Sequence, residues 1–523
     1  MTGASCGVAR ALVSGMRNRF QRLNCILHFT GHLLEVLGAL LLLPLVVALV
    51  YWGRRGDGWD TVNAFLVPAA VSMCLGFVLR NVFTCQALDT VGSMLTCAVG
   101  WLACSAVGAL PLVMVLGCSY LDAYFEAMSG FTTTGITVFA GLDRMASSIL
   151  FWRALTQWLG GLGILSFFLI VTFRASSAHH IFGAESHKIS ATRPAPGLFN
   201  TLKILWQIYV GLTLLAVLVL ALAKMPVFDA VCHALTALST GGFSPHDASI
   251  DFYRANGHAH YRFIEYALVF FMMLGGINFL IHYRVLTRDF TALWDNIEIR
   301  YWWGLIAGFT LIVMIDRFRQ SGALAALFER GTLPDAGDLE RTFRYSIFQV
   351  MAILTTTGFG TMDIGSEFFG TVGRQLFLVM MVIGGCVGST SGGFKVLRVA
   401  MLSRLMQREL FKAKVSGRAS TGLVIDNRIV PDAEIHRVAA LFFAWMALLV
   451  IGGGITALFS SQGTLASFSG MFSALGNIGP CYISVADMME MPAVVKITYI
   501  IGMLAGRLEI LPVLLLLSPR VWR

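Results

Sequence analysis

The sequence predicts an all-α integral membrane protein. In it a span, a short half-helix, a Thr/Gly-rich filter and a second span occur four times, after two extra N-terminal spans. The first observation is composition: the 523 residues are 57% hydrophobic and 13% charged, against about 25% charged residues in soluble proteins. The second is a series of long apolar runs, and the third is four similar Gly-containing windows between them. A soluble enzyme and a disordered chain are both excluded by this composition.

A membrane-spanning helix needs about 20 mostly apolar residues. The predicted spans are 33–52, 61–79, 91–116, 150–173, 201–223, 263–283, 301–315, 373–397, 436–459 and 493–517. Several arginines precede the first run, which is longer than the core of a signal peptide. We therefore expect the first run to be an uncleaved span.

The connections between spans predict the orientation. Segments 174–203, 284–300 and 395–437 carry Lys and Arg, and such segments stay on the cytoplasmic side. Both termini are then cytoplasmic as well. The net charge of +9 lies mainly in these segments, so the expected partner surface is the lipid bilayer and not nucleic acid.

Neither a disulfide framework nor a metal site is predicted. The ten cysteines include no C-x-x-C pair, and most lie in apolar runs, where a free thiol behaves as a small hydrophobe. His179, His180 and His187 lack a convincing metal-ligand spacing and are expected in a solvated loop. No Walker-type or GxGxxG motif occurs, so the chain itself should bind no nucleotide.

Residues Val438 to Ala486 contain no Asp, Glu, Lys or Arg. One span accounts for about 20 of them, and the remainder is too short and too rich in Gly and Ser to cross a membrane. A re-entrant segment fits, because non-helical backbone at membrane depth must be buried in protein or line a watery cavity.

Four windows resemble this re-entrant segment. Residues 126–135 read EAMSGFTTTG, 233–242 read HALTALSTGG, 349–358 read QVMAILTTTG, and 470–479 read GMFSALGNIG. Aligned on the last glycine, they also agree in apolar and small-residue columns. Asp122 and Asp229 lie where the first two half-helices begin, as suits a helix N-terminus. We interpret the four windows as copies of one structural unit that is repeated four times in the chain.

Such windows suit the passage of a cation. Rings of backbone carbonyls can replace the hydration shell of an alkali cation, and glycine adopts the required backbone turns at little cost. A half-helix also aims its partially negative C-terminus at the axis. The alternative is that Gly, Ser and Thr only allow helices to pack closely in lipid, which four matched copies make less attractive.

The windows FEAMSGFTTTG, ALSTGGFSP, LTTTGFG and ALGNIGP resemble the filter segments of TrkH/TrkG-type bacterial potassium uptake proteins, in the Trk/Ktr/HKT superfamily. The resemblance implies a pseudo-fourfold pore in the inner membrane, and glycine in all four windows resembles the potassium-selective type. The second and fourth windows depart from TTTG, so the symmetry is approximate. The implied potassium-binding residues are Thr133, Thr134, Gly135, Thr240, Gly241, Gly242, Thr356, Thr357, Gly358, Asn477, Ile478 and Gly479.

The eighth predicted span is interrupted by GGCVGSTSGG at 384–393. Each glycine costs a helix about 1 kcal/mol relative to Ala, so we expect an unwound intramembrane loop; close packing against a neighbour is the alternative. The resemblance implies that this loop is a gate. Its implied residues are Gly384, Gly385, Gly388, Gly392, Gly393 and Lys395.

The last predicted span carries Arg507 and Glu509. An arginine at mid-membrane costs at least about 2.5–3.5 kcal/mol, so Arg507 should face the bundle interior. One interpretation is a structural pair with Glu509 or nearby carbonyls. The preferred interpretation, which the resemblance supports, is a cation in the permeation path that restrains flux and anchors the 384–393 loop.

The predicted division is 1–90 for the N-terminal segment, then pore repeats 91–200, 201–295, 296–435 and 436–523. The expected function is gated potassium uptake through a channel-like pore, and an ion-coupled symporter (H⁺ or Na⁺) is the alternative. The chain is not expected to be an enzyme or to hold an intrinsic cofactor. The resemblance implies a homodimer and a TrkA-type cytoplasmic regulatory subunit that carries the nucleotide.

Overall fold

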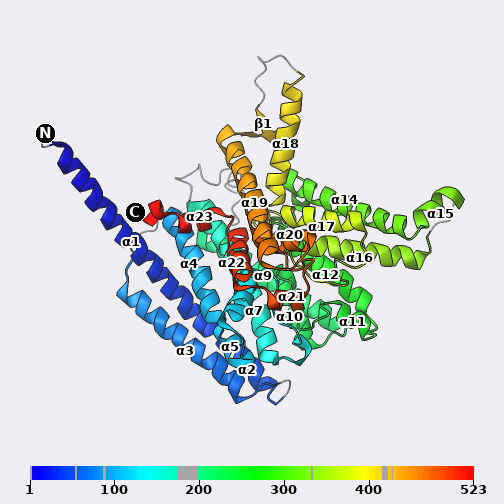
Figure 1. Cartoon of the computed structure of the whole chain (residues 1–523), viewed down its shortest axis with the longest axis horizontal. Coiled ribbons are helices and arrows are strands. Elements are labelled where there is room, and N and C mark those ends of the chain that lie inside the picture. The colour runs from blue at the N-terminus through cyan, green and yellow to red at the C-terminus, as the bar shows by residue number, and fades with distance from the viewer. Residues whose placement is uncertain are drawn as a thin grey trace. The chain divides into compact units, whose positions relative to one another are not determined.

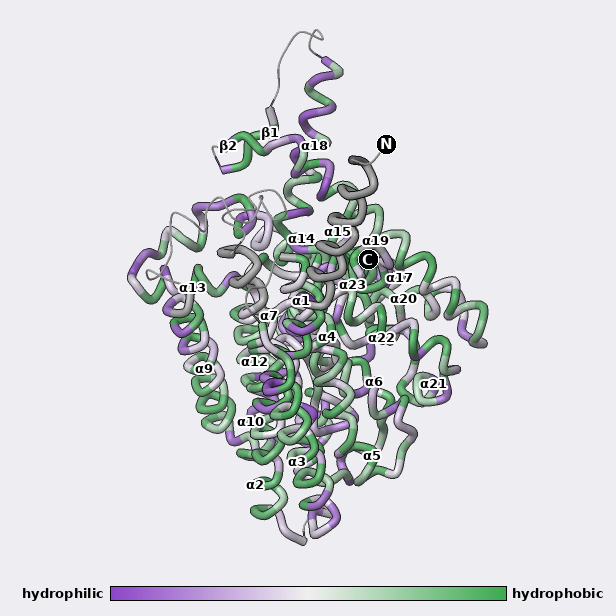
Figure 2. Tube along the Cα trace, turned by 90° about the vertical axis from the view of Figure 1, so that its left-hand side faces the viewer, coloured by the Kyte–Doolittle hydropathy of each residue, from purple (hydrophilic) through white to green (hydrophobic). Residues whose placement is uncertain are grey.

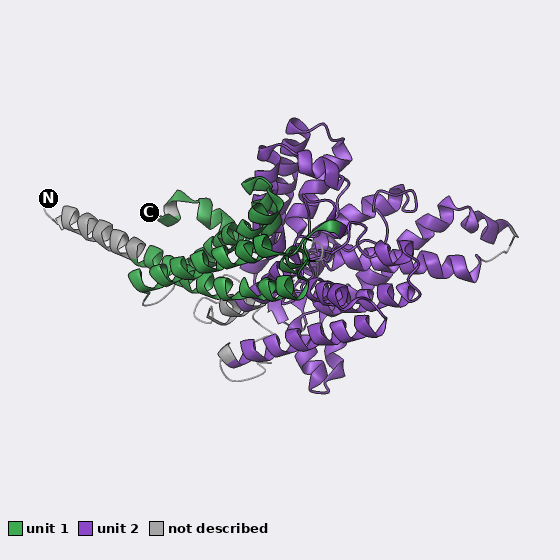
Figure 3. Cartoon of the chain, turned by 90° about the horizontal axis from the view of Figure 1, so that it is seen from below, with its two compact units in different colours: residues 1–128, 144–152, 508–523 green, residues 129–143, 153–507 purple. Residues whose placement is uncertain are grey.

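The computed structural model describes residues 3–53, 56–85, 90–174, 198–330, 334–414, 422–426 and 428–522, and most of these are helical. The chain divides into two compact units, shown in Figure 3. Unit 1 contains residues 1–128, 144–152 and 508–523, and unit 2 contains residues 129–143 and 153–507.

Unit 1 is built from long apolar helices. Its helices are α1 (Gly3–Leu40), α2 (Leu42–Val50), α3 (Trp59–Val82), α4 (Thr90–Gly108), α5 (Leu110–Leu116), α23 (Leu511–Leu517) and α24 (Pro519–Trp522). α6 (Tyr120–Phe131), η1 (Leu142–Arg144) and α7 (Ser147–Arg174) contribute to both units. α1 and α3 lie side by side (Figure 1), and a methyl group on Gly31 would meet the carbonyl oxygen of Gly76 at 2.8 Å. Two glycines therefore let these helices approach closely.

A disulfide in unit 1 corrects one expectation. Cys25 in α1 is bonded to Cys85, which follows α3, with Cα atoms 4.4 Å apart. The prediction that the cysteines form no disulfide is wrong for this pair. The close packing of α1 against α3 brings together two cysteines 60 residues apart, and no local spacing signals this.

Unit 2 contains most of the remaining elements. Its helices are α9 (Leu198–Leu222), α10 (Val227–Leu238), α11 (Asp251–Ala255), α12 (Tyr261–Gly276), α13 (Phe279–Leu286), η3 (Phe290–Leu293), α14 (Ile297–Gln320), α15 (Ala323–Arg330), α16 (Ala336–Leu354), α17 (Thr371–Ile383), α18 (Val396–Lys412), α19 (Asp432–Phe459), α20 (Thr464–Gly476), α21 (Val485–Glu490) and α22 (Ala493–Arg507). Strands β1 (Leu423–Ile425) and β2 (Arg428–Val430) pair antiparallel, with Leu423 opposite Val430. The basic 395–437 segment thus holds a helix and a hairpin, whereas residues 175–197 of the other basic segment lie outside the described residues.

The surface of the helices is apolar where a soluble protein would be polar. Six helices of the described chain are long and apolar enough to cross a membrane, and the bent pair α12–α13 makes a seventh. Leu214, Leu218, Phe443 and Leu458 are more than half exposed, and hydrophobic residues dominate α9 in Figure 2. Large exposed apolar faces indicate contact with lipid. The prediction of an all-α, multi-pass membrane protein is confirmed.

Besides the one-residue interruptions at Leu41 and Ala109, two spans predicted as continuous helices are broken. The 263–283 span bends by 104° between α12 and α13, where the side chain of Asn278 accepts a hydrogen bond from Leu280 N–H and so begins a new helix. The 493–517 span breaks after Arg507, because Pro512 cannot continue a helix without a clash at residue 508. The break predicted within 373–397 is present between α17 and α18.

Candidate functional site

We call residues 132–135, 239–242, 355–358 and 476–479 filter segments one to four. The half-helices α6, α10, α16 and α20 lead into them and end alike. The residue two positions before each final glycine has a left-handed φ: Thr133 (52°), Thr240 (54°), Thr356 (58°) and Asn477 (54°). The next N–H donates to a carbonyl five residues earlier: Thr134 to Ser129 (2.8 Å), Gly241 to Thr236 (2.9 Å), Thr357 to Ala352 (2.9 Å) and Ile478 to Ser473 (3.0 Å). This is the Schellman ending of a helix, repeated four times.

Three of the four left-handed residues are threonines. Gly or Asn is usual at this position, and a β-branched residue there is strained by about 1–3 kcal/mol. Two of the threonine hydroxyls contact the unwound 384–393 loop. Thr356 Oγ1 accepts a hydrogen bond from Gly392 N–H at 2.7 Å, and Thr240 Oγ1 lies 3.4 Å from Thr390 Oγ1. A glycine at either position would relieve the strain but lose the contact.

The four filter glycines form a closed ring. Each has a positive φ: 84° for Gly135, 77° for Gly242, 83° for Gly358 and 105° for Gly479. Each also lies against the carbonyl of the residue before the next glycine. An added methyl group would collide with this carbonyl in the first three cases and approach it to 3.0 Å at Gly479. The pairs are Gly135 with Gly241, Gly242 with Thr357, Gly358 with Ile478, and Gly479 with Thr134. The order one, two, three, four, one places the segments around a common axis.

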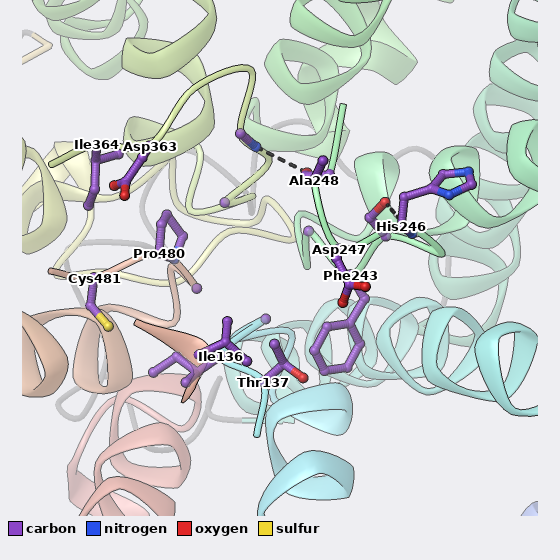
Figure 4. A pocket seen from close by; sticks show the side chains of 18 of the residues that line it. Ile136, Thr137, Phe243, His246, Asp247, Ala248, Asp363, Ile364, Pro480 and Cys481 are labelled. Carbon is purple, nitrogen blue, oxygen red and sulfur yellow. Dashed lines mark hydrogen bonds between the residues drawn. The ribbon is translucent and has the colours of Figure 1, made fainter. Parts of the chain in front are cut away.

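A cavity of about 500 Å³ opens at one end of this ring, and all four filter glycines line it. The carboxylates of Asp247, Asp251 and Asp363 also line it, and Figure 4 shows Asp247 and Asp363 on different segments of its wall. Arg153 contributes a positive charge to the lining. Its guanidinium lies 4.1 Å from the centre of the Phe243 ring and donates to the carbonyl of Ser244 at 3.3 Å. We call this cavity the vestibule.

His246 connects two parts of the vestibule wall through contacts with Asp143 and Asp229. Its Nδ1 lies 2.5 Å from Asp143 Oδ1, and its Nε2 lies 3.0 Å from Asp229 Oδ2. Burial lowers the pKa of His246, but the hydrogen bonds to Asp229 and Asp143 outweigh burial and raise this pKa above its ordinary value. Tyr253 also donates to Asp229 at 3.0 Å. Asp229 therefore holds the vestibule loop in addition to lying in the first turn of α10.

The 384–393 loop contacts the other end of the filter segments. Residues 383–396 are all buried. Thr390 Oγ1 donates to the carbonyls of Leu238 at 2.9 Å and Gly275 at 3.0 Å, and Val387 N–H donates to Glu298 at 2.7 Å. The predicted unwound loop is thus present, and it is held by the end of α10, the break after α12 and the start of α14.

Arg507 meets this loop directly. Its Nη1 donates to Thr390 O at 2.6 Å, and its Nη2 donates to Gly160 O in α7 at 2.9 Å. Arg507 is 2% exposed. The sequence allows two interpretations, a structural pair with Glu509 or nearby carbonyls and a cation that anchors the 384–393 loop. In the structure the Arg507 guanidinium contacts two carbonyls, and one of them belongs to the loop. Lys395, with φ 83°, donates from Nζ to Ser391 O and so closes the loop on itself.

Sequence reasoning brought out the four glycines, the loop and Arg507, but it missed the residues that join them. Thr390 and Glu298 have no motif of their own. The glycine pairs Gly160-Gly161 and Gly275-Gly276 could have been found, because each recurs in the span that follows a filter segment. A methyl group on Gly160 would collide with Phe131 O, and one on Gly275 would approach Leu238 O at 3.1 Å.

The described residues contain no group of three or more His, Cys, Asp or Glu side chains that could hold a metal ion. His179, His180 and His187 lie outside the described residues. The oxygen atoms that converge in this site are instead main-chain carbonyls around the ring.

Comparison with known proteins agrees with this geometry. Residues 62–523 match the TrkH family, described as cation transport proteins. The Trk system potassium uptake protein TrkH of Escherichia coli K12 is 32% identical over 505 residues, covering 95% of this chain and 99% of that protein. The protein of the same name from Salmonella typhimurium is 31% identical over 509 residues, with the same coverage.

The crystal structure of the potassium transporter TrkH from Vibrio parahaemolyticus superimposes with a TM-score of 0.81 at 28% identity, covering 96% of this chain and 100% of that one. The sequence match, the fold and the ring of four filter glycines agree. The chain belongs to the TrkH family of cation transport proteins, and not to a family of enzymes.

Proposed function

We propose that this protein takes up potassium through a selective, channel-like pore in the bacterial inner membrane. The ion would move down its electrochemical gradient, driven by a negative-inside membrane potential. The closed ring of filter glycines is the observation that carries the proposal, because it arranges main-chain carbonyls from four segments around one axis. The similar proteins named for potassium uptake support the choice of ion.

The proposed potassium ligands are oxygen atoms of the filter segments. Each half-helix ends beside its segment, and its partially negative C-terminus favours a cation. The proposed binding residues are Thr133, Thr134, Gly135, Thr240, Gly241, Gly242, Thr356, Thr357, Gly358, Asn477, Ile478 and Gly479. The acidic side chains of the vestibule would raise the local concentration of cations at the entrance.

The proposed gate is the 384–393 loop together with Lys395 and Arg507. The loop contacts the filter segments at the end opposite the vestibule, so its movement would open or close the path. The glycines that would permit this movement are Gly384, Gly385, Gly388, Gly392 and Gly393.

The proposed assembly is a homodimer with a cytoplasmic, TrkA-type regulatory subunit that carries the nucleotide. The term "Trk system" in the names of similar proteins suggests more than one component. Both termini would be cytoplasmic, and the chain would hold no cofactor of its own. The N-terminal segment would be 1–90, and the pore repeats 91–200, 201–295, 296–435 and 436–523, each pore repeat containing one filter segment.

An ion-coupled potassium symporter (H⁺ or Na⁺) is the alternative. Such transporters usually contain two repeats with paired broken helices, whereas here four filter segments share one ring. In a planar bilayer, a potassium current whose reversal potential does not change with pH would favour the channel-like mechanism, and a shift with pH would favour H⁺ coupling.

Complementation tests the function. A bacterium deficient in potassium uptake should grow on low potassium when it expresses this protein with its regulatory subunit. The Gly135→Ser variant should grow less well and admit more Na⁺, because a side chain at φ 84° is strained and would collide with Gly241 O. Failure of the well-expressed wild type to restore growth would contradict the proposal.

A further inference from the structure

The second filter segment lacks a brace that the first and third possess. In segment one, Thr132 Oγ1 and Thr134 Oγ1 are hydrogen-bonded at 2.7 Å. Thr355 and Thr357 form the same 2.7 Å hydrogen bond in segment three. Segment two has Gly241 at the corresponding position. It cannot form this hydrogen bond, and its backbone is intrinsically the most flexible of the three.

The side chain of Gln157, in α7, occupies the vacant position. Its Nε2 donates to Gly241 O at 2.6 Å, and its Oε1 accepts from Phe243 N–H at 3.0 Å. Because a carbonyl only accepts and an N–H only donates, these two partners fix the orientation of the amide. A methyl group on Gly241 would collide with the Gln157 amide. Gly241 therefore makes room for Gln157, and Gln157 holds the segment on both sides of Gly242.

Gln157 differs from its counterparts in the other three spans. Gly160, Gly275 and Gly506 each lie in the span that follows a filter segment. Each approaches the carbonyl oxygen that lies four residues before the final glycine of that preceding segment. This shared contact lets the three spans be aligned position by position. Gln157, Met272 and Met503 lie three residues before these glycines. In the span that follows segment three, Met381 lies three residues before Gly384. All four side chains are 0% exposed. A methionine therefore occurs in each span for which the next filter segment has Thr or Ile just before its final glycine. The glutamine occurs in the one span for which the next segment has a glycine, Gly241, at that position.

The carbonyl that Gln157 binds is itself part of the ring, since Gly241 O is the oxygen against which Gly135 packs. We propose that Gln157 is a positioning residue that fixes the Gly241 carbonyl and thereby sets the discrimination of the pore between K⁺ and Na⁺. This inference rests on the proposed cation conduction. Without the two hydrogen bonds, segment two can move its carbonyl towards the axis and coordinate the smaller Na⁺.

The test measures K⁺ and Na⁺ permeability of the purified protein in proteoliposomes of defined composition. Gln157→Met keeps the volume but removes both hydrogen bonds, and it should raise the Na⁺/K⁺ permeability ratio by about tenfold, as expected for the loss of a buried hydrogen bond. The double variant Gln157→Met/Gly241→Thr reproduces the Met–Thr pairing of the other segments and should restore the ratio to within about twofold of wild type. Gln207→Met, at an exposed position of α9, is the matched control and should change nothing.

Gln157→Glu keeps an acceptor for Phe243 N–H but cannot donate to Gly241 O when ionised, and it should lose selectivity by a similar factor. It serves as the second variant if Gln157→Met does not give a single peak in size-exclusion chromatography. Unchanged selectivity in the folded single variants, or a double variant no better than Gln157→Met, would overturn the inference. Absence of K⁺ flux through the wild type would instead overturn the proposed function, so the two failures are distinguishable.

Discussion

The guanidinium of Arg507 donates to the carbonyl oxygen of Thr390, 2.6 Å away, and so joins the end of α22 to the unwound loop. The same guanidinium reaches Gly160 O in α7. Thr390 in turn donates to Leu238 O, immediately before filter segment two. One buried arginine therefore connects the loop, the span that follows segment one and, through Thr390, the half-helix α10 that leads into segment two.

Replacing Arg507 should raise cation flux without changing selectivity. Arg507→Ala removes a positive charge and the 2.6 Å hydrogen bond that holds the loop, while the ring of glycines is untouched. We expect several-fold faster flux in proteoliposomes and an unchanged K⁺/Na⁺ ratio. Arg507→Lys separates the two causes, because lysine keeps the charge but lacks the planar fork that binds two carbonyls. An unchanged or abolished flux in well-folded Arg507→Ala would contradict the prediction.

Thr356→Val should loosen the loop. Valine matches threonine in shape but leaves the buried N–H of Gly392 without its 2.7 Å acceptor, at a cost of about 1–3 kcal/mol. Cys386, a buried thiol within the loop, provides the measurement. In a background whose other cysteines are replaced, a maleimide should modify Cys386 at least fivefold faster in the variant.

Thr133→Val is the matched control for this experiment. Thr133 has the same left-handed conformation, and its Oγ1 has no hydrogen-bond partner among the described residues. Its replacement should leave the labelling rate of Cys386 near that of the wild type. Equal rates for both valine variants would show that the Thr356 hydrogen bond does not hold the loop.

Gly242→Ala should abolish potassium uptake. Its φ of 77° disfavours any side chain, and a methyl group would collide with Thr357 O in the next segment. Gly211→Ala in α9 is the matched control, because no atom outside the adjacent backbone of α9 lies within 4 Å of its added methyl group, and alanine favours a helix by about 1 kcal/mol. Growth on low potassium should fail with the first variant and persist with the second. Normal growth with Gly242→Ala would contradict the tight packing of the ring.

The sequence was sufficient for the elements whose cause is local. Apolar runs predict the six helices of the described residues that are long and apolar enough to cross a membrane. The glycines of 384–393 indicate an unwound loop because glycine disfavours helix wherever it lies. The break after α12 is not predicted by the local N-cap at Asn278 alone, because it also depends on tertiary contacts: the carbonyls of Gly275 and Gly276 accept from the N–H groups of Thr390 and Cys386 in the loop. Likewise, propensity argues against a left-handed Thr356, and the Schellman ending of α16 that requires this conformation is not signalled by the residue type. Gln157 went unnoticed because a single glutamine in an apolar helix acquires meaning only beside Gly241.

The vestibule should lose stability as pH rises through the pKa of His246. Each ring nitrogen of His246 lies within 3.0 Å of a carboxylate, Asp143 or Asp229, and only the doubly protonated ring can donate to both. A histidine whose pKa is raised in the folded state stabilises the fold fully below its unfolded pKa of about 6.5 and progressively less as pH rises through the raised pKa. The melting temperature of the wild type should therefore fall between pH 6.5 and pH values above the raised pKa. His246→Gln, which cannot titrate, should show a flatter profile over this range, and His260→Gln, at an exposed position, should retain the slope of the wild type. Parallel profiles for His246→Gln and wild type would show that this imidazolium does not hold the vestibule wall.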